Sequence, residues 1–173
     1  AIGFYGDTGS DLITEKSPAG KGFLPEVSID WEAATKPVEN AGVRTVHLRT
    51  GIVLSKKGGA LKKMLPPFYA GGGGILGSGK QYMSWISIDD MVRAIKFLIY
   101  EDSLNGPYNL TAPNPVTNKE FTKILGKVIK RPTILPLPGF AAKLIFGEMA
   151  EALLLSGNNV IPEKLLPAGY TFK

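Results

Sequence analysis

The sequence contains no cysteine and only one histidine, His47, among its 173 residues. It therefore has no disulfide, no thiolate nucleophile and no cysteine-ligated zinc or iron–sulfur centre. A single histidine also excludes histidine-cluster metal sites, and any Ser-His-Asp triad would have to use His47. We expect His47 to be structural, because it lies inside the strand-like stretch 43–50, and we expect no metal site.

Long hydrophobic runs are also missing. No window approaches the roughly 18 consecutive apolar residues of a membrane-spanning helix, so we expect no membrane partner. The first ten residues lack a basic start and already contain Asp7, which argues against a signal peptide. The sequence predicts a cytoplasmic protein, or one of an organelle stroma or matrix if its source is eukaryotic.

The excess of positive charge is small, at +5. Basic residues are spread over Lys56-Lys57, Lys62-Lys63 and Lys130-Arg131, without the aromatic-rich basic stripe that binds nucleic acid. We therefore expect solvated surface charge and no nucleic-acid partner.

Hydrophobic residues make up 44% of the chain, enough for one compact core. Their periodicity alternates between strand and helix. The predicted strands are 1–5, 43–54, 82–88, 106–110, 133–137 and 170–172, and the predicted helices are 24–40, 60–69, 88–100, 117–130 and 140–155. Such alternation predicts an α/β fold with a largely parallel sheet. Two helix starts are marked by capping sequences, Ser87–Asp90 and Thr117–Glu120.

The glycine-rich stretch 71–79 mimics two nucleotide-binding motifs. Residues 74–80 have P-loop spacing, but Gln81 lacks the hydroxyl that holds Mg²⁺, and a strand-like segment follows instead of a helix. Gly72, Gly74 and Gly77 have dinucleotide-fingerprint spacing but follow a helix. We therefore expect a hairpin or lid loop, and no dinucleotide fingerprint within this chain.

Several segments together resemble one known family, and the strings Ala-Pro-Asn-Pro-Val and Met-Leu-Pro-Pro-Phe are specific for it. In order, the matching segments are Ala1–Gly6, Asp30–Ala34, Leu48–Leu54, Gly58–Leu61, Met64–Phe68, Leu76–Gly79, Ser84–Ile86 with Asp89-Asp90, Ala112–Asn118, Gly147–Ala150 and Leu153–Gly157. The chain resembles the atypical short-chain dehydrogenases/reductases of the NAD-dependent epimerase/dehydratase superfamily. Within them it is similar to the epimerase family proteins, some of which are labelled cell-division-inhibitor-like.

The resemblance covers only the C-terminal portion of that family. It implies the C-terminal part of a Rossmann-type parallel sheet plus a small α/β substrate domain. On this basis residues 1–56 and 81–100 would belong to the Rossmann-type domain, and residues 57–80 and 101–173 to the substrate domain. The full-length protein would bind NADP(H). This chain alone would bind it poorly, because the phosphate loop is missing.

The resemblance also implies a Ser/Thr, Tyr and Lys trio, in which the tyrosine handles the proton and the lysine lowers its pKa. These positions fall at Ala1, Phe23 and Val27, so the standard dyad is missing, and we expect Phe23 and Val27 to be core residues of their helix. The arginine that clamps the diphosphate in sugar-nucleotide enzymes is replaced by Met83-Ser84-Trp85, which argues against a nucleotide-sugar substrate.

Few candidate site residues remain. Tyr5 and Glu26 are the weak catalytic candidates; the alternatives are an aromatic packed on the next loop and an exposed helix carboxylate. The resemblance implies that a strand end borders the nicotinamide through backbone groups, and that an apolar wall faces the substrate. The strand end is Thr50, Gly51, Ile52 and Val53, and the wall is Met64, Phe68, Met83 and Trp85.

Three functional hypotheses follow. The first is an NADP(H)-binding atypical reductase or epimerase-like protein with an unknown small-molecule substrate. The second is a non-enzymatic Rossmann-type protein that senses the cofactor or binds a partner, for example in division. The third is association with another copy or with a missing N-terminal part, which would cover an open sheet edge.

Overall fold

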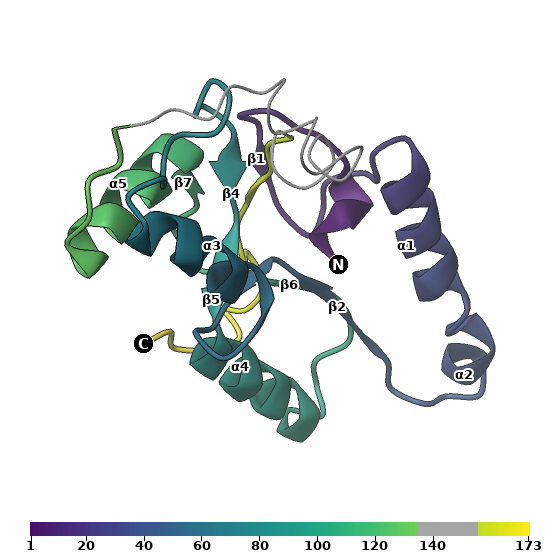
Figure 1. Ribbon diagram of the computed structural model, residues 1–173. Coiled ribbons are helices and arrows are strands. Elements are labelled where there is room, and N and C mark those ends of the chain that lie inside the picture. The colour runs from purple at the N-terminus through teal and green to yellow at the C-terminus, as the bar shows by residue number, and fades with distance from the viewer. Residues whose placement is uncertain (135–155) are drawn as a thin grey trace.

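The structure is a computed structural model that describes residues 1–134 and 156–173 (Figure 1). Short strands alternate with helices along the chain. In order, the elements are η1 Ile2–Tyr5, β1 Leu12–Ile13, α1 Phe23–Ala33, α2 Lys36–Asn40, β2 Val46–Thr50, β3 Ile52–Leu54, α3 Gly59–Tyr69, β4 Tyr82–Met83, β5 Trp85–Ser87, α4 Ile88–Tyr100, β6 Gly106–Leu110, β7 Val116–Thr117, α5 Asn118–Ile129 and β8 Asn159–Val160. Among the described helices, none has the length and apolar character to cross a membrane.

Parallel pairing dominates, which confirms the α/β prediction. β2 pairs in parallel with β6, β3 with β5 and β1 with β8, whereas β4 and β7 are antiparallel. β2 and β3 follow each other directly along the chain and are separated only by Gly51. The Gly51 N–H donates to the Leu110 carbonyl at 3.1 Å and the Ile52 N–H to the Ser84 carbonyl at 2.8 Å. At Gly51 the hydrogen-bonding neighbour of this extended stretch therefore changes from β6 to β5.

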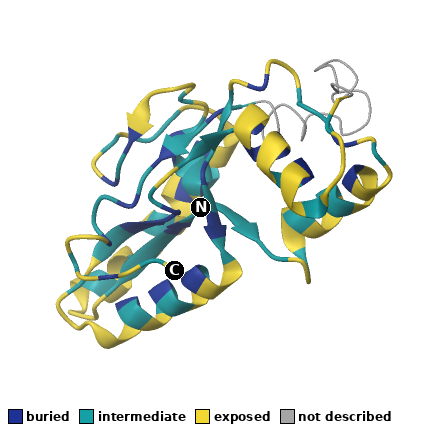
Figure 2. Ribbon diagram, turned by 90° about the vertical axis from the view of Figure 1, so that its left-hand side faces the viewer, coloured by how far each residue is buried: buried dark blue, intermediate teal, exposed yellow. Residues whose placement is uncertain are grey.

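The main hydrophobic core lies between α4 and the strands. Its buried members are Ile86, Ala94, Leu98, Tyr108, Leu110, Leu165 and Tyr170. α4 supplies two of them, four residues apart, as expected for one face of a helix. Figure 2 shows the buried positions of this helix on its strand side and the exposed ones on its outer side. Its apolar pattern is therefore what fixes α4 against the sheet.

Side chains satisfy both ends of α4. The Ser87 hydroxyl accepts from the Asp90 N–H at 3.0 Å at the start, as the capping sequence predicts. At the other end, the Arg44 guanidinium donates to the carbonyls of Leu98, Ile99 and Leu104. The Leu98 and Ile99 carbonyls belong to the last turn of α4, whose backbone acceptors have no partner within the helix. The Thr117–Glu120 capping box of α5 is likewise confirmed.

Five predicted elements differ. Residues 2–5 form a 3-10 helix rather than a strand, with the Gly6 N–H donating to the Gly3 carbonyl. The helix expected over 24–40 is two helices, because Pro37 has no N–H to continue the first. The strand expected over 82–88 is β4 and β5, followed by α4. Residues 133–134 and 170–172 are not strand; residues 135–137 and the helix expected over 140–155 lie outside the described residues.

The C-terminal tail, residues 156–173, is held by one buried carboxylate, that of Asp90. It accepts from the Tyr170 hydroxyl at 3.1 Å, from the Lys173 N–H at 3.1 Å and from Arg93 at 2.9 Å. The Tyr170 hydroxyl lies in the core beside this charge. Burial, and then the neighbouring Asp90 carboxylate, raise the pKa of Tyr170 to about 12.

We predict that this contact makes stability depend on alkaline pH. The folded state keeps the Tyr170 proton more tightly than the unfolded chain, whose tyrosine pKa is near 10. The stabilisation is therefore complete below pH 10 and is lost as pH rises toward 12. In Tyr170→Phe, denaturant unfolding should show a loss of about 1 kcal/mol at neutral pH and no such alkaline component. An unchanged alkaline slope would contradict the contact.

The close packing around Gly51 gives a second prediction. A Cβ at Gly51 would lie 2.5 Å from the Ser84 carbonyl oxygen and 2.9 Å from the Thr111 methyl, so Gly51→Ala should cost about 2–3 kcal/mol of unfolding free energy. Gly72→Ala is the matched control, because a Cβ there meets nothing nearer than 3.5 Å. Equal unfolding midpoints for the two variants would refute the close packing of these strands.

Candidate functional site

A buried arginine lies at the centre of the candidate site. Arg49, on β2, is 5% exposed. Its Nε and Nη2 donate to the two carboxylate oxygens of Glu32 on α1, at 2.8 and 2.7 Å. Its guanidinium carbon lies 3.4 Å from the centre of the Phe4 ring. The two-point ion pair and the aromatic face together compensate the buried positive charge.

The Tyr5 hydroxyl extends this cluster into the protein. Arg49 Nη1 donates to it at 3.0 Å, and the hydroxyl itself donates to Asn109 Oδ1 at 2.7 Å. The Asn109 side-chain amide donates onward to the Ile161 carbonyl at 3.0 Å, and its backbone N–H donates to Glu15. Tyr5 therefore joins η1, β2, β6 and the tail, and its hydroxyl is engaged as both donor and acceptor.

Electrostatics keep the cluster in one protonation state near neutral pH. Burial raises the pKa of Tyr5, and the hydrogen bond from Arg49 offsets this only in part. Burial disfavours the charged form of Glu32, but hydrogen bonds and attraction from Arg49 outweigh it and hold the pKa of Glu32 below its usual value. The cluster thus contains a carboxylate, a guanidinium and a neutral phenol. Tyr5 is placed as a neutral hydrogen-bonding group rather than as an ionised base.

His47 lies next to this cluster, on the same strand. Its Nε2 is 2.9 Å from the Thr35 hydroxyl and 3.3 Å from Glu39 Oε1, and its Nδ1 is 3.8 Å from Glu32 Oε2. All these partners belong to α1, α2 and the residues that join them. The histidine therefore holds the two helices against β2, which agrees with the structural role predicted for it.

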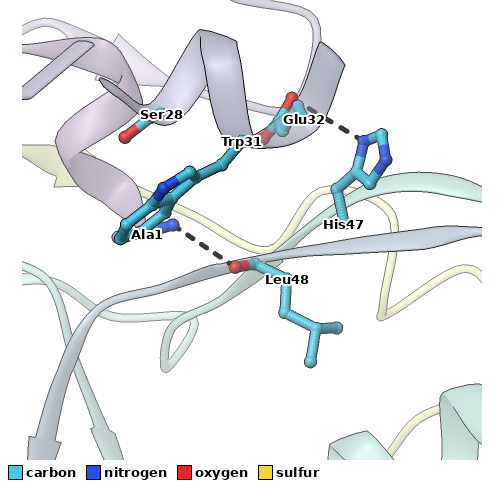
Figure 3. Close-up of a pocket in the computed structure, with 6 residues that line it drawn as sticks. All are labelled: Ala1, Ser28, Trp31, Glu32, His47 and Leu48. Carbon is cyan, nitrogen blue, oxygen red and sulfur yellow. Dashed lines mark hydrogen bonds and ion pairs between the residues drawn. The ribbon is translucent and has the colours of Figure 1, made fainter. Parts of the chain in front are cut away.

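A small open pocket of about 160 Å³ borders the cluster (Figure 3). In the figure the Trp31 side chain lies along one side of it, and the Ala1 amino group faces the Leu48 carbonyl at 3.4 Å. The other lining residues are Ser28, Glu32 and His47. The described residues contain no group of three or more histidine, cysteine or acidic side chains able to hold a metal ion.

The predicted residues of α1 are not buried as expected. Phe23, at the tyrosine position of the resemblance, is 77% exposed, so its prediction as a core residue is wrong. It occupies the first position of the helix, where no strand covers it. Val27 is half-buried, and Glu26 is exposed rather than buried. Proton transfer by Glu26 was expected only for a buried carboxyl, and this condition is not met.

The four residues predicted to border the nicotinamide lie at the carboxyl end of β2 and the start of β3. Thr50, Gly51, Ile52 and Val53 are all half-buried. β6 ends beside them, at Leu110. Carboxyl ends of neighbouring parallel strands form the usual binding edge of an open α/β sheet. These residues therefore lie where two neighbouring parallel strands end, and their contact with a nicotinamide stays a prediction.

The predicted substrate wall comes from two places. Met64 and Phe68 are four residues apart on α3, which packs against β3, and Phe68 is 5% exposed. Met83 ends β4 and Trp85 begins β5, and both are half-buried. Between them, Ser84 is buried and accepts from the Val160 N–H at 2.8 Å. α3, β4 and β5 thus supply apolar side chains, of which Phe68 is the most deeply packed.

Sequence reasoning did not find the Arg49 cluster. In the sequence Arg49 stands out only as part of the matching segment Leu48–Leu54, and nothing there links it to Glu32 or Asn109. A usable signal was present, because an arginine within the apolar run 46–54 must find a carboxylate when it is buried. The identity of that carboxylate needs the fold, since Glu32 is on a different element.

Comparison with known proteins identifies the family. Epimerase family protein Mb2239 of Mycobacterium bovis is 50% identical over 172 residues, which are 99% of this chain and 57% of that protein. The chloroplastic epimerase family protein SDR39U1 homolog of Arabidopsis thaliana is 43% identical over 173 residues, 49% of its length. The chain belongs to the epimerase family. It corresponds to a C-terminal portion of such a protein and spans about half the length of these relatives.

Two further comparisons agree with this family. The domain of unknown function DUF1731 matches residues 137–173, of which 156–173 are described. The crystal structure of human epimerase family protein SDR39U1 with NADPH superposes on the whole chain with a TM-score of 0.91 and 32% identity, covering 59% of that structure. The Rossmann-type fold implied by the resemblance is therefore confirmed.

We predict that Glu32 stabilises the fold mainly by neutralising Arg49. Glu32→Gln leaves the arginine buried without a charge partner and should cost about 2 kcal/mol in denaturant unfolding at neutral pH. Because the pKa of Glu32 is lowered from 4.5, its contribution is present above that pH and disappears as pH falls through the folded-state value. In Glu32→Gln, the free energy of unfolding should therefore not show this decrease at acidic pH.

The exposed Glu26 of the same helix supplies the control. Glu26→Gln changes the same functional group where no arginine is paired with it, and its unfolding midpoint should stay within about 0.5 kcal/mol of the parent. If both variants lose the same amount, the Arg49–Glu32 pair has no special role in stability.

Proposed function

We propose that this chain is the C-terminal portion of an NADP(H)-binding, atypical reductase- or epimerase-like protein that acts on an unidentified small molecule. The main support is the superposition of the whole chain on the human SDR39U1 structure, which was solved with NADPH. A TM-score of 0.91 at 32% identity indicates that the residues here occupy equivalent places. The sugar-nucleotide arginine clamp is absent from Met83–Trp85, which argues against a nucleotide-sugar substrate.

The residues at the sheet edge fit a nicotinamide. Gly51 has no room for a Cβ, because the Ser84 carbonyl oxygen and the Thr111 methyl group pack closely against its backbone. The Thr111 hydroxyl nearby is buried and has no hydrogen-bond partner among the described residues. When bound, the cofactor would supply or accept a hydride. Thr50, Gly51, Ile52 and Val53 would hold its ring through backbone groups and exclude water.

Other residues would shape the substrate side. Met64, Phe68, Met83 and Trp85 would form an apolar wall that selects a substrate with a hydrophobic portion. Tyr5 would act as a positioning residue, because its hydroxyl is already bound by Arg49 and Asn109. The division into Rossmann-type and substrate domains stays part of this proposal. We also propose that a preceding segment of the protein, or a second copy of this chain, covers the open edge of the sheet.

One observation favours a second function, cofactor sensing without turnover. Phe23 occupies the position that the resemblance gives to the catalytic tyrosine, it has no hydroxyl, and it is 77% exposed. A phenyl group has no proton to give or take, so Phe23 cannot perform the proton transfer of the family's tyrosine. A protein that binds NADP(H) and displays Phe23 to a partner, for example in division, would use these features.

The test is NADPH binding by a longer protein that carries the segments its relatives have in addition. We expect quenching of intrinsic fluorescence at micromolar NADPH, and about a hundredfold weaker binding by the 173-residue chain, which lacks the phosphate loop of the family. No NADPH binding by the longer protein would refute the proposal.

Turnover then separates the two functions. NADPH oxidation with a panel of carbonyl substrates supports a reductase, whereas tight binding without turnover of any of them supports sensing. Activity that survives Phe23→Ala but is lost in Tyr5→Phe, with a changed pH profile, would assign the proton to Tyr5. Activity retained in Tyr5→Phe with reduced thermal stability is the result that a positioning role predicts.

A further inference from the structure

A groove between α4 and the tail is lined by side chains that the candidate site does not use. Its volume is about 450 Å³. α4 supplies Arg93, Lys96, Phe97 and Tyr100, and the tail supplies residues 169–171. In Figure 1 this helix is at the lower end of the molecule, close to the C-terminus and away from α1 and α2. The groove is thus separate from the Arg49 cluster.

The floor and rim of the groove are apolar and aromatic. The rings of Phe97 and Tyr170 are 5.7 Å apart between centroids and form the floor. On the rim, Tyr100 is 72% exposed. The apolar surface continues along the exposed side of α4, where Val92 and Ile99 are more than half exposed. Apolar and aromatic side chains exposed together around a groove are typical of an interaction site.

Both charged side chains that line the groove are cationic. Arg93 is already engaged, because it donates to Asp90 and to the Thr171 carbonyl, each at 2.9 Å. Lys96 makes no ion pair with any described residue, and its Nζ lies 5.9 Å from the Tyr100 ring centre. The groove therefore presents one uncompensated positive charge beside an exposed aromatic ring. A partner with negative charge and an apolar side chain would complement both.

We propose that this groove binds an acidic protein segment that carries an apolar or aromatic side chain. The side chain would pack on Phe97 and Tyr170, and carboxylates of the segment would face Lys96. The open shape and its continuation along α4 favour an extended chain over a small molecule, which usually needs an enclosed cavity. Tyrosine and arginine are also the residue types that carry much of the binding energy at protein interfaces. The proposal is independent of NADP(H) binding.

The experiment uses the 173-residue chain and a fluorescein-labelled synthetic peptide of alternating glutamate and leucine around a central tryptophan. Fluorescence anisotropy should report saturable binding that weakens with rising salt. A peptide with lysine in place of glutamate is the control ligand and should not bind. Lys96→Glu and Tyr100→Ala should each weaken binding about tenfold or more. Lys123→Glu, the same charge reversal at an exposed site on α5, should leave it unchanged.

Backbone amide shifts in nuclear magnetic resonance locate the contact independently of the variants. On adding the acidic peptide, the shifts of Lys96, Gly169 and Thr171 should move and that of Lys123 should not. Equal binding of the basic peptide, full binding by a folded Lys96→Glu variant, or shifts confined to other surfaces would overturn the proposal. So would binding of anionic phospholipid vesicles or an RNA oligonucleotide in the absence of peptide binding. If Lys96→Glu does not fold, Lys96→Gln replaces it.

Discussion

The positive charge of Arg49 is the constraint around which this part of the protein is organised. A guanidinium that is 5% exposed must be neutralised and hydrogen-bonded at the same time, because an unpaired buried charge is strongly destabilising. Glu32 supplies the charge, Phe4 the aromatic face and Tyr5 a hydroxyl. These partners come from α1 and η1, so both elements are fixed to β2 by a single side chain. The pocket in Figure 3 borders this arrangement, with Glu32 among its lining residues.

The molecule separates two kinds of surface. The carboxyl ends of β2 and β6 present tightly packed backbone at Gly51, which suits recognition of a planar ring through main-chain groups. The outer side of α4 presents exposed side chains and Lys96, which has no ion pair among the described residues, and there we propose recognition of another chain. Ligand chemistry and partner recognition can therefore change independently, because they share few residues.

Features encoded locally were predictable from the sequence, and features that depend on distant partners were not. The capping of α4 by Ser87 and of α5 by Thr117 needs only residues three positions apart, and both were predicted. The parallel pairing of the strands was predicted from the alternation of strands and helices along the sequence. In contrast, residues 1–5 are as apolar as a strand but form a 3-10 helix, since nothing in a short apolar run reveals whether a neighbouring strand is present.

The candidate site shows the same limit. The resemblance points to a strand end at Thr50–Val53, and β2 does end at Thr50, because the motif residues are contiguous. Burial of Phe23 was predicted wrongly, since helical spacing does not tell whether the first turn of a helix is covered. The Arg49 cluster joins residues that are 17 and 44 positions apart from it, and Tyr5 and Asn109 are 104 apart. No periodicity in the sequence connects such positions.

The pairing of β1 with β8 has a consequence for how the chain reaches its native state. Leu12 and Ile13 align with Asn159 and Val160, so β1 pairs with a strand far along the chain. Closing a loop of this length is entropically unfavourable, and we expect it late in folding. During synthesis, the segment that holds Ile13 can pair only after residues 159–160 have left the ribosome. Its apolar side chains therefore lack this neighbour for most of the time that the intervening residues are being added.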